Sequence, residues 1–258
     1  MCPATTDERV GNRKLTTWRS APGRALARWA LDVARWARPH GVLLITLAVG
    51  LVLCGLCTVG AAQVYDEVID VDGVAVLDQP VLEGAMAARN PALTAVVKGY
   101  TNLGGPVGMP VLATTVLALL AWRSRSWEPL LLGLATGVGS LAMTVAGKAA
   151  VGRARPPLVD AVPPFETSFS FPSGHSLNAL ALSGIVVYVL VRRQATARAR
   201  VLTVVLGTVF ALTMGLTRVY LGHHWLTDVL VAWLLALAWL AVVITAHRLY
   251  LTTRHVRA

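Results

Sequence analysis

Residues 42–62 read VLLITLAVGLVLCGLCTVGAA, a run of 21 residues without a charged side chain. A stretch of this length and hydrophobicity crosses the hydrocarbon core of a bilayer as one α-helix. Five further apolar runs are long enough to do the same, at residues 92–122, 129–147, 174–191, 201–217 and 228–247. The chain has 258 residues, of which 55% are apolar and 14% charged. The sequence therefore predicts an all-α integral membrane bundle of six transmembrane helices.

The distribution of charge predicts the orientation of this bundle. With six spans, one side of the membrane holds 17 of the 23 Lys and Arg residues, in the segments 1–41, 123–128, 192–200 and 248–258. The other side holds nine of the 13 Asp and Glu residues. Because basic connections stay inside, we expect both termini to be cytoplasmic and the protein to be multi-pass in the plasma (inner) membrane. The formal charge of +10 is spread over short connections, which does not fit a nucleic-acid-binding domain.

The ends of the chain differ from this core. Residues 1–40 are predicted to form a basic cytoplasmic tail with an amphipathic helix over Arg24–Arg38 that ends before Pro39. Its apolar face would carry Leu26, Trp29, Val33 and Trp36. This helix either lies on the inner leaflet or docks against another part of the protein. Residues 41–250 form the six-span domain, and residues 251–258 form a second cytoplasmic tail.

Two outer segments are less regular. Residues 63–90 are rich in carboxylates and predict a solvated loop, with a short surface helix over Asp78–Arg89. The second apolar run contains Lys98 and the breaker Asn102–Pro106, which predicts a kinked or broken span. Lys98 either extends to the outer interface or points at a site as an additional cation.

Three polar stretches stand at the ends of the later spans. Residues 148–156, KAAVGRARP, place Lys148, Arg153 and Arg155 at the outer end of the third span. A cation at this depth costs free energy unless it pairs with an anion. Each of these three residues alone is also explained as an interfacial anchor. Arg153 is the weaker candidate, as a contact for a headgroup or a second phosphate.

The second stretch, FPSGH at residues 171–175, opens the fourth span. Ser173 and Gly174 at a helix start offer backbone N–H groups that suit a phosphate, and His175 can transfer a proton beside it. A Ser-capped helix with an interfacial histidine is the simpler alternative.

The third stretch, TRVYLGHHWLTD at residues 217–228, joins the last two spans. It supplies Arg218, His224 and Asp228, and on a helix the last two share a face. Taken alone, these residues also suit interface anchoring and helix capping. Span order places all three stretches on the outer side, where they can meet. Together they predict a site for an anionic lipid headgroup, most simply a lipid phosphate.

The combination resembles the type 2 phosphatidic acid phosphatase superfamily, whose motifs are Lys-x6-Arg-Pro, Pro-Ser-Gly-His and Ser-Arg-x5-His-x3-Asp. The matches are Lys148 to Pro156, Pro172 to His175, and Arg218 to Asp228, with Thr217 in place of the family's Ser. The spacing selects His224 rather than His223.

The resemblance implies that His224 attacks phosphorus to form a phosphohistidine, with Asp228 orienting its ring. His175 would act first as acid and then as base. The phosphate would be held by Lys148, Arg155, Arg218 and the amides of Ser173 and Gly174. The resemblance also implies hydrolysis without metal or cofactor. Cys54 and Cys57, inside the first span, are expected to be packing residues.

The expected function is hydrolysis of the terminal phosphate of phosphatidic acid, phosphatidylglycerol phosphate or a polyprenyl diphosphate. A non-catalytic protein that binds or transports lipid phosphates remains an alternative. Vanadate-dependent haloperoxidases resemble the same motifs, but they are soluble, and six apolar spans argue against them. The sequence does not indicate an oligomeric state.

Overall fold

The computed structural model describes the backbone of residues 9–10, 13–14 and 21–257, and the side chains of residues 41–253. The predicted tail therefore lies largely outside the described residues, as do the side chains of the predicted amphipathic face. A two-residue antiparallel pair, β1 (Arg9–Val10) and β2 (Arg13–Lys14), precedes the helices. Every other regular element in the described part of the chain is helical.

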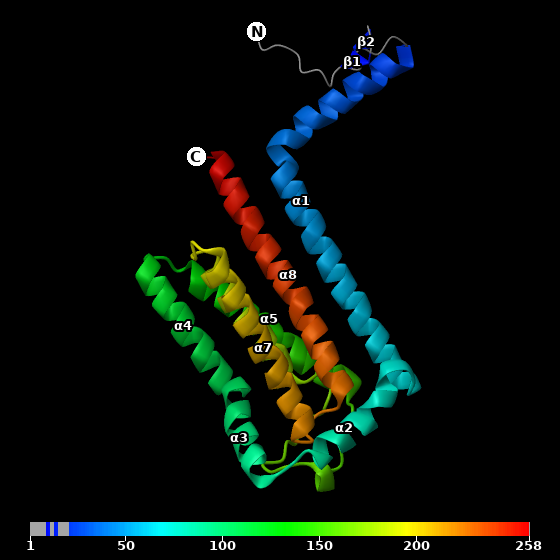
Figure 1. Ribbon diagram of the computed structural model, residues 1–258, viewed down its shortest axis with the longest axis vertical. Helices are drawn as coiled ribbons and strands as arrows, with labels where there is room; N and C mark the ends of the chain where they lie inside the picture. The colour runs from blue at the N-terminus through cyan, green and yellow to red at the C-terminus, as the bar shows by residue number, and fades with distance from the viewer. Residues whose placement is uncertain (1–8, 11–12, 15–20, 258) are drawn as a thin grey trace.

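The helices confirm the predicted membrane bundle (Figure 1). They are α1 (Ala21–Asp70), α2 (Asp78–Ala87), α3 (Pro91–Thr101), α4 (Gly108–Ser124), α5 (Glu128–Val151), α6 (Gly174–Val191), α7 (Ala197–Tyr220) and α8 (Leu226–Arg257). Five of the described helices are long and apolar enough to cross a membrane, and the bent pair α3–α4 gives a sixth span if its two halves cross together. Short 3-10 turns lie at Gly73–Leu77, Asn102–Gly104 and Leu158–Asp160.

The core of the bundle is built around α6, which packs against α4, α5, α7 and α8. Leu177, Ile185 and Val189 on α6 are almost completely buried. α1 runs along α8 at the edge of the bundle (Figure 1). Its outward side chains, such as Leu51 and Leu56, are exposed, as expected for a helix that faces lipid tails.

The second span is broken where the sequence predicts it. α3 and α4 meet at 56°, and the break contains Gly104, Gly105 and Pro106. A Cβ at Gly104 would lie 2.3 Å from Met214 Sδ, so glycine lets the break pack closely against this side chain of α7. The break thereby brings irregular backbone to the polar end of the bundle.

Two predictions about α1 and the segment after it are wrong. The helix does not end before Pro39 but continues to Asp70, and it changes direction towards its N-terminal end in Figure 1. A proline inside a helix removes one hydrogen bond and bends the helix, which need not stop. The first part of the predicted solvated loop is helical, since α1 continues to Asp70, and in the turn that follows Glu67 accepts a hydrogen bond from Val74 N (2.7 Å). The predicted short helix exists as α2, but its first residue, Asp78, is buried.

The polar stretches of the sequence meet at one end of the bundle. The C-terminal ends of α5 and α7 and the N-terminal ends of α6 and α8 lie together there, with α2 beside them (Figure 1). The C-terminal end of α8 lies at the opposite end. The alternating direction of the helices therefore brings the polar stretches of the candidate site together.

Candidate active site

The loop of residues 152–173, between α5 and α6, crosses this end of the bundle. Val162 N donates to Leu221 O (2.8 Å), and Ser170 N donates to Arg153 O (2.8 Å). The first bond holds the loop against the α7–α8 connection, and the second joins the two ends of the loop to each other. The loop can therefore present Arg155 and Glu166 to side chains that come from the helices.

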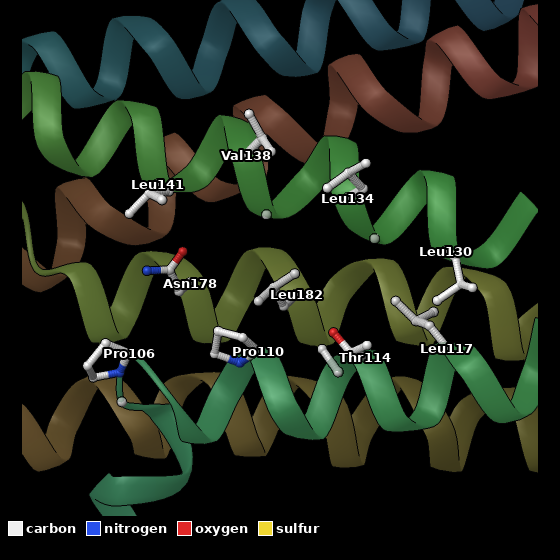
Figure 2. Close-up of a pocket in the computed structure, with 14 residues that line it drawn as sticks. Pro106, Pro110, Thr114, Leu117, Leu130, Leu134, Val138, Leu141, Asn178 and Leu182 are labelled. Atoms are coloured by element: carbon white, nitrogen blue, oxygen red, sulfur yellow. The ribbon is translucent and has the colours of Figure 1, made fainter.

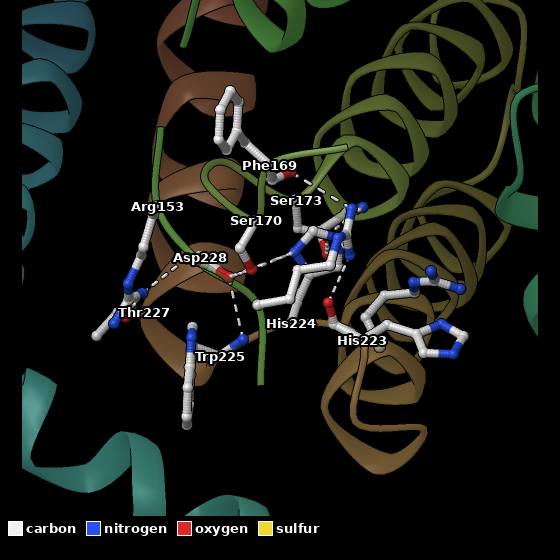
Figure 3. A network of polar contacts seen from close by, with 12 residues as sticks. Arg153, Phe169, Ser170, Ser173, His223, His224, Trp225, Thr227 and Asp228 are labelled. Carbon is white, nitrogen blue, oxygen red and sulfur yellow. Dashed lines mark hydrogen bonds and ion pairs between the residues drawn. The ribbon is translucent and has the colours of Figure 1, made fainter. Parts of the chain in front are cut away.

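His224 and Asp228 form the centre of the site (Figure 3). They lie four residues apart, His224 in the α7–α8 connection and Asp228 in the first turn of α8, and His224 Nδ1 is 3.3 Å from Asp228 Oδ2. Both side chains are almost completely buried. Asp228 accepts hydrogen bonds, so the proton of His224 belongs on Nδ1 and the lone pair on Nε2. Arg155 Nη1 lies 3.1 Å from that Nε2.

The environment of His224 keeps its ring neutral. Burial lowers its pKa to about 4, although the hydrogen bond to Asp228 acts in the opposite direction. A neutral imidazole keeps the ring lone pair that a nucleophile needs, and here Arg155 Nη1 donates towards it. His223 differs, because its Nε2 lies 2.7 Å from Val162 O and its ring points away from His224 in Figure 3.

Two cations line a cavity of about 480 Å³ that His224 also lines, and a third cation lines the cavity beside it. Lys148 and Arg155 line it directly, and Arg218 lines a neighbouring cavity of about 440 Å³. Lys148 Nζ donates to Phe169 O, and Arg155 Nε donates to Ser168 O (2.6 Å). Arg218 is 2% exposed, and its Nε has no hydrogen-bond partner among the described residues. This cluster has the charge and the spare donors that an anion requires.

Glu166 lies among these cations and was not predicted from the sequence. Its carboxylate pairs with Arg218 Nη2 and with Arg155 Nη2 (3.4 Å). Burial alone would raise the pKa of Glu166, but Arg218 and Arg155 lower it to about 2. Glu166 is therefore ionised at neutral pH. Its carboxylate holds the two guanidinium groups together as a bound anion would.

His175 lines both cavities, at the first turn of α6. Gly105, in the break between α3 and α4, is close to it, and a Cβ there would lie 3.4 Å from His175 Nε2. The broken span thus closes the site on the side of His175. The His175 ring lines the same cavity as His224, where it is placed to exchange a proton with a bound group.

The Ser173–Gly174 pair differs from the prediction. Ser173 N donates to Asp228 O (3.2 Å), and Ser173 Oγ caps α6 by accepting from Ser176 N (3.4 Å). Ser173 is fully buried and does not line the cavity, whereas Gly174 does. A Cβ at Gly174 would lie 3.0 Å from Thr144 Cγ2, so glycine permits close packing of α6 on α5. Only the Gly174 amide is left for an anion.

Arg153 and Lys98 also have positions that the sequence did not decide. Arg153 is neither an interfacial anchor nor a lining residue, because it pairs with Asp228 Oδ1 and Asp78 Oδ2, both at 2.7 Å. Lys98 lines the same cavity as Arg218 and His175. Among the described residues, no group of three or more His, Cys, Asp and Glu side chains is arranged to hold a metal ion.

A family model described as the PAP2 superfamily matches residues 128–250. Phosphatidylglycerophosphatase B of Bacillus subtilis (strain 168) is 33% identical over 163 residues, which cover 63% of this chain and 79% of that protein. The chain belongs to the PAP2 superfamily. It is a membrane-embedded lipid phosphatase of the PAP2 type.

Solved structures agree with this assignment to the PAP2 superfamily. The crystal structure of a transmembrane PAP2 type phosphatidylglycerolphosphate phosphatase from Bacillus subtilis matches with a TM-score of 0.62 at 28% identity. The match covers 82% of this chain and 96% of that one. LpxE from Aquifex aeolicus matches with a TM-score of 0.51 at 19% identity, over 65% of this chain and 94% of its own, and shows the fold alone.

The PAP2 motifs omit several residues that the structure places at the site. Glu166 and Ser170 lie in the loop before PSGH, and Ser170 Oγ donates to Asp228 Oδ2. Thr101 Oγ1 lies 3.2 Å from Arg218 Nη1 and 2.9 Å from Thr217 Oγ1. The only signal for them in the sequence was a charged or hydroxyl residue near the outer end of the bundle, and such a residue does not indicate its partner.

Proposed function

We propose that this PAP2 protein hydrolyses the terminal phosphate of a lipid phosphate or diphosphate, with His224 as the nucleophile. The observation that carries the proposal is the orientation of His224. Its Nδ1 faces Asp228, and its Nε2 faces Arg155 in a cavity that His175 and Lys148 also line. Nucleophile, proton donor and anion-binding cations thus share one cavity, as phosphoryl transfer requires.

An apolar groove beside this cavity supports a lipid as the substrate (Figure 2). The groove has a volume of about 530 Å³ and lies between α4, α5 and α6. Pro106, Leu141 and Asn178 line both the groove and the cavity of His224. The rest of the groove lies along the membrane-spanning parts of the helices. A phosphate in the cavity can therefore keep its hydrocarbon chain in the groove.

The first chemical step transfers the phosphoryl group to the enzyme. His224 Nε2 attacks phosphorus, and the bond between phosphorus and the lipid oxygen breaks. His175 gives its proton to that oxygen, which leaves as a lipid alcohol or, from a diphosphate, as a lipid monophosphate. Asp228 accepts the hydrogen bond from Nδ1–H and stabilises the charge that develops on the ring.

The second step releases phosphate. His175, now neutral, takes a proton from water, and the water oxygen attacks phosphorus as the phosphorus–nitrogen bond breaks. This restores neutral His224 and protonated His175. We propose that Lys148, Arg155 and Arg218 neutralise the non-bridging oxygens in both steps, and that the Gly174 amide donates a hydrogen bond to one of them. Because these cations supply the positive charge, we expect activity to persist in excess chelator.

The substrate class follows from the groove and from the similar proteins. The Bacillus subtilis relative is named a phosphatidylglycerophosphatase, so phosphatidylglycerol phosphate is one candidate. Phosphatidic acid and polyprenyl diphosphates have the same combination of an anionic head and a long chain. The charge bias of the connections supports an extracytoplasmic site in the plasma membrane. A panel of these three lipids, scored for phosphate release, would rank them.

Phosphate release from the detergent-solubilised protein tests the proposal. Wild type, His224→Ala and His175→Ala are compared in excess chelator, with lipid binding measured in parallel. We expect turnover by wild type and loss of about 10³-fold or more in His224→Ala. Full activity of His224→Ala would refute the assignment of His224 as the nucleophile. Lipid binding without turnover by wild type would instead favour a binding or transport protein.

A further inference from the structure

Asp228 has two oxygens with different partners. Oδ2 accepts from His224 Nδ1, Ser170 Oγ and Trp225 N (3.0 Å). Oδ1 accepts from Arg153 Nη1 at 2.7 Å. The first oxygen contacts the proposed nucleophile, and the second is bound from the opposite side. The orientation of the whole carboxylate therefore depends on what holds Arg153.

Arg153 is held by α2. Its Nη2 lies 2.7 Å from Asp78 Oδ2, and its Nη1 also lies 2.7 Å from Thr227 Oγ1. Asp78 in turn accepts from Thr227 N (2.9 Å) and from Thr227 Oγ1 (2.7 Å). Asp78 thus binds both Arg153 and the residue next to Asp228. This bridge joins the outer segment to the start of α8, where the PAP2 motif ends.

The bridge is largely removed from water. The side chains of Arg153, Asp78 and Asp228 are 18%, 7% and 0% exposed. The guanidinium lies 5.6 Å from the centroid of the Trp225 ring. Charge-assisted bonds in such surroundings are strong and directional. A planar guanidinium that binds two carboxylates at once also fixes their relative orientation, which an ammonium group cannot do.

We propose that Asp78 and Arg153 are positioning residues, through which α2 sets the orientation of Asp228 and hence of the His224 ring. The inference rests on the proposed role of His224. It also gives a function to the acidic segment before the second span, which the motifs leave unexplained. Neither residue touches the phosphate cavity, so both act on turnover through Asp228.

Two substitutions test the bridge without changing the size of the side chain greatly. Asp78→Asn and Arg153→Gln are each expected to lower kcat by about 10- to 100-fold, the usual effect of losing a partner that orients a site residue. KM should change by less than about threefold, because the phosphate ligands are intact. Arg153→Lys keeps the charge but loses the two-carboxylate geometry, and should recover only part of kcat.

The pH profile separates orientation from simple loss of stability. The charged and titratable groups around His224 are Lys148, Arg155, Glu166, His175, Arg218 and Asp228. Arg153→Gln removes a positive charge behind Asp228, so the pKa of His224 should rise and the acid limb of kcat/KM should move to higher pH. Asp78→Asn removes a negative charge and should move this limb the other way or leave it in place. Substitutions that only destabilise the fold are not expected to shift the acid limb of kcat/KM in this way.

Arg89→Gln is the matched control. Arg89 also joins the outer segment to the bundle, since its Nε donates to Tyr220 O (2.9 Å) and its Nη1 to Asp160 O (2.7 Å). It has no bond to Asp228, so its kcat should equal that of wild type. Equal losses in Arg89→Gln and Arg153→Gln would overturn the inference.

Failure of the positioning role and failure of the proposed function give different results. If His224→Ala is inactive while Asp78→Asn and Arg153→Gln have the kcat and acid limb of wild type, the positioning role is refuted and the nucleophile stands. If His224→Ala retains full activity, the proposed function fails first. Thermal unfolding in detergent, measured for each variant, identifies any loss that comes from misfolding, and Arg153→Lys then carries the comparison.

Discussion

Replacing Asp228 by asparagine tests whether the site needs two acceptor oxygens at this position. All the groups around the carboxylate donate hydrogen bonds, from His224, Ser170 and Trp225 to Oδ2, and from Arg153 to Oδ1. Asparagine has one acceptor oxygen and one NH₂ donor. In either orientation, therefore, its NH₂ group faces another donor inside a fully buried site.

The two orientations damage the site differently. With NH₂ in place of Oδ2, His224 must turn its lone pair to Nδ1 and carry its proton on Nε2, the atom proposed to attack phosphorus. With NH₂ in place of Oδ1, Arg153 loses a charge-assisted bond, worth about 1.5–3 kcal/mol. The same substitution in a Ser-His-Asp triad lowers kcat about 10⁴-fold through the wrong tautomer. We expect Asp228→Asn to lower kcat by about 10³- to 10⁴-fold, or about 4–5 kcal/mol in activation free energy.

The assay is phosphate release at saturating lipid phosphate, with solubilised Asp228→Asn beside wild type. KM should stay within about threefold of wild type, because Asp228 does not contact the phosphate. Glu83→Gln is the control, since it makes the same chemical change at an exposed position on α2 and should leave kcat unchanged. A kcat for Asp228→Asn within about tenfold of wild type, in a variant that unfolds at the same temperature, would refute the reasoning.

Three further predictions follow from the site. Glu166→Gln removes the anion that pairs with Arg155 and Arg218, so inorganic phosphate should inhibit at about tenfold lower concentration; unchanged inhibition would contradict this. Because burial lowers the pKa of His224 to about 4, its ring stays neutral above that pH. We therefore expect kcat/KM to stay level down to about pH 5, and a fall centred near the ordinary histidine pKa of about 6.5 would argue against His224. Thr114→Trp obstructs the apolar groove, and should raise KM for a long-chain lipid phosphate but not for a water-soluble phosphate ester. Thr115→Trp, at a residue that does not line the groove, should raise neither of these KM values.

The sequence was sufficient to predict the bundle and the meeting of the motifs. Uninterrupted apolar runs define the spans because a bilayer accepts few charges. Consecutive spans cross in opposite directions, which brings the C-terminal ends of α5 and α7 and the N-terminal ends of α6 and α8 to one side. The break of the second span was also predictable, since Gly104, Gly105 and Pro106 interrupt helical hydrogen bonding. These features depend on neighbours in the sequence.

Contacts between distant residues were not predictable in this way. Arg153 and Asp78 are separated by 75 positions, as are Arg153 and Asp228. Nothing in the local pattern distinguishes Arg153 from an interfacial anchor, or Asp78 from a solvated carboxylate. Ser173 was assigned to phosphate because a helix start offers free N–H groups, but Asp228 O takes the Ser173 N–H. Packing between α6 and α8 decided this, and one sequence does not show it.

The continuation of α1 to Asp70 has a more local cause. The carboxylates at residues 66–72 suggested a loop, yet Glu67 is tied to Val74 N. A Cβ at Gly73, whose φ is +50°, would lie 2.4 Å from Glu67 Cδ, so the chain can turn closely around this side chain. The turn delivers α2, and with it Asp78, to the site.

The central claim is that His224 becomes phosphorylated, and isolation of the intermediate tests it most directly. His175→Ala slows the second step, and a radiolabelled phosphate ester with a good leaving group allows the first step without an acid. After rapid quenching in alkaline detergent, we predict label on the peptide that contains His224, stable in alkali and lost in acid. Label on another residue, or release of phosphate in a single turnover with no labelled protein, would contradict the account.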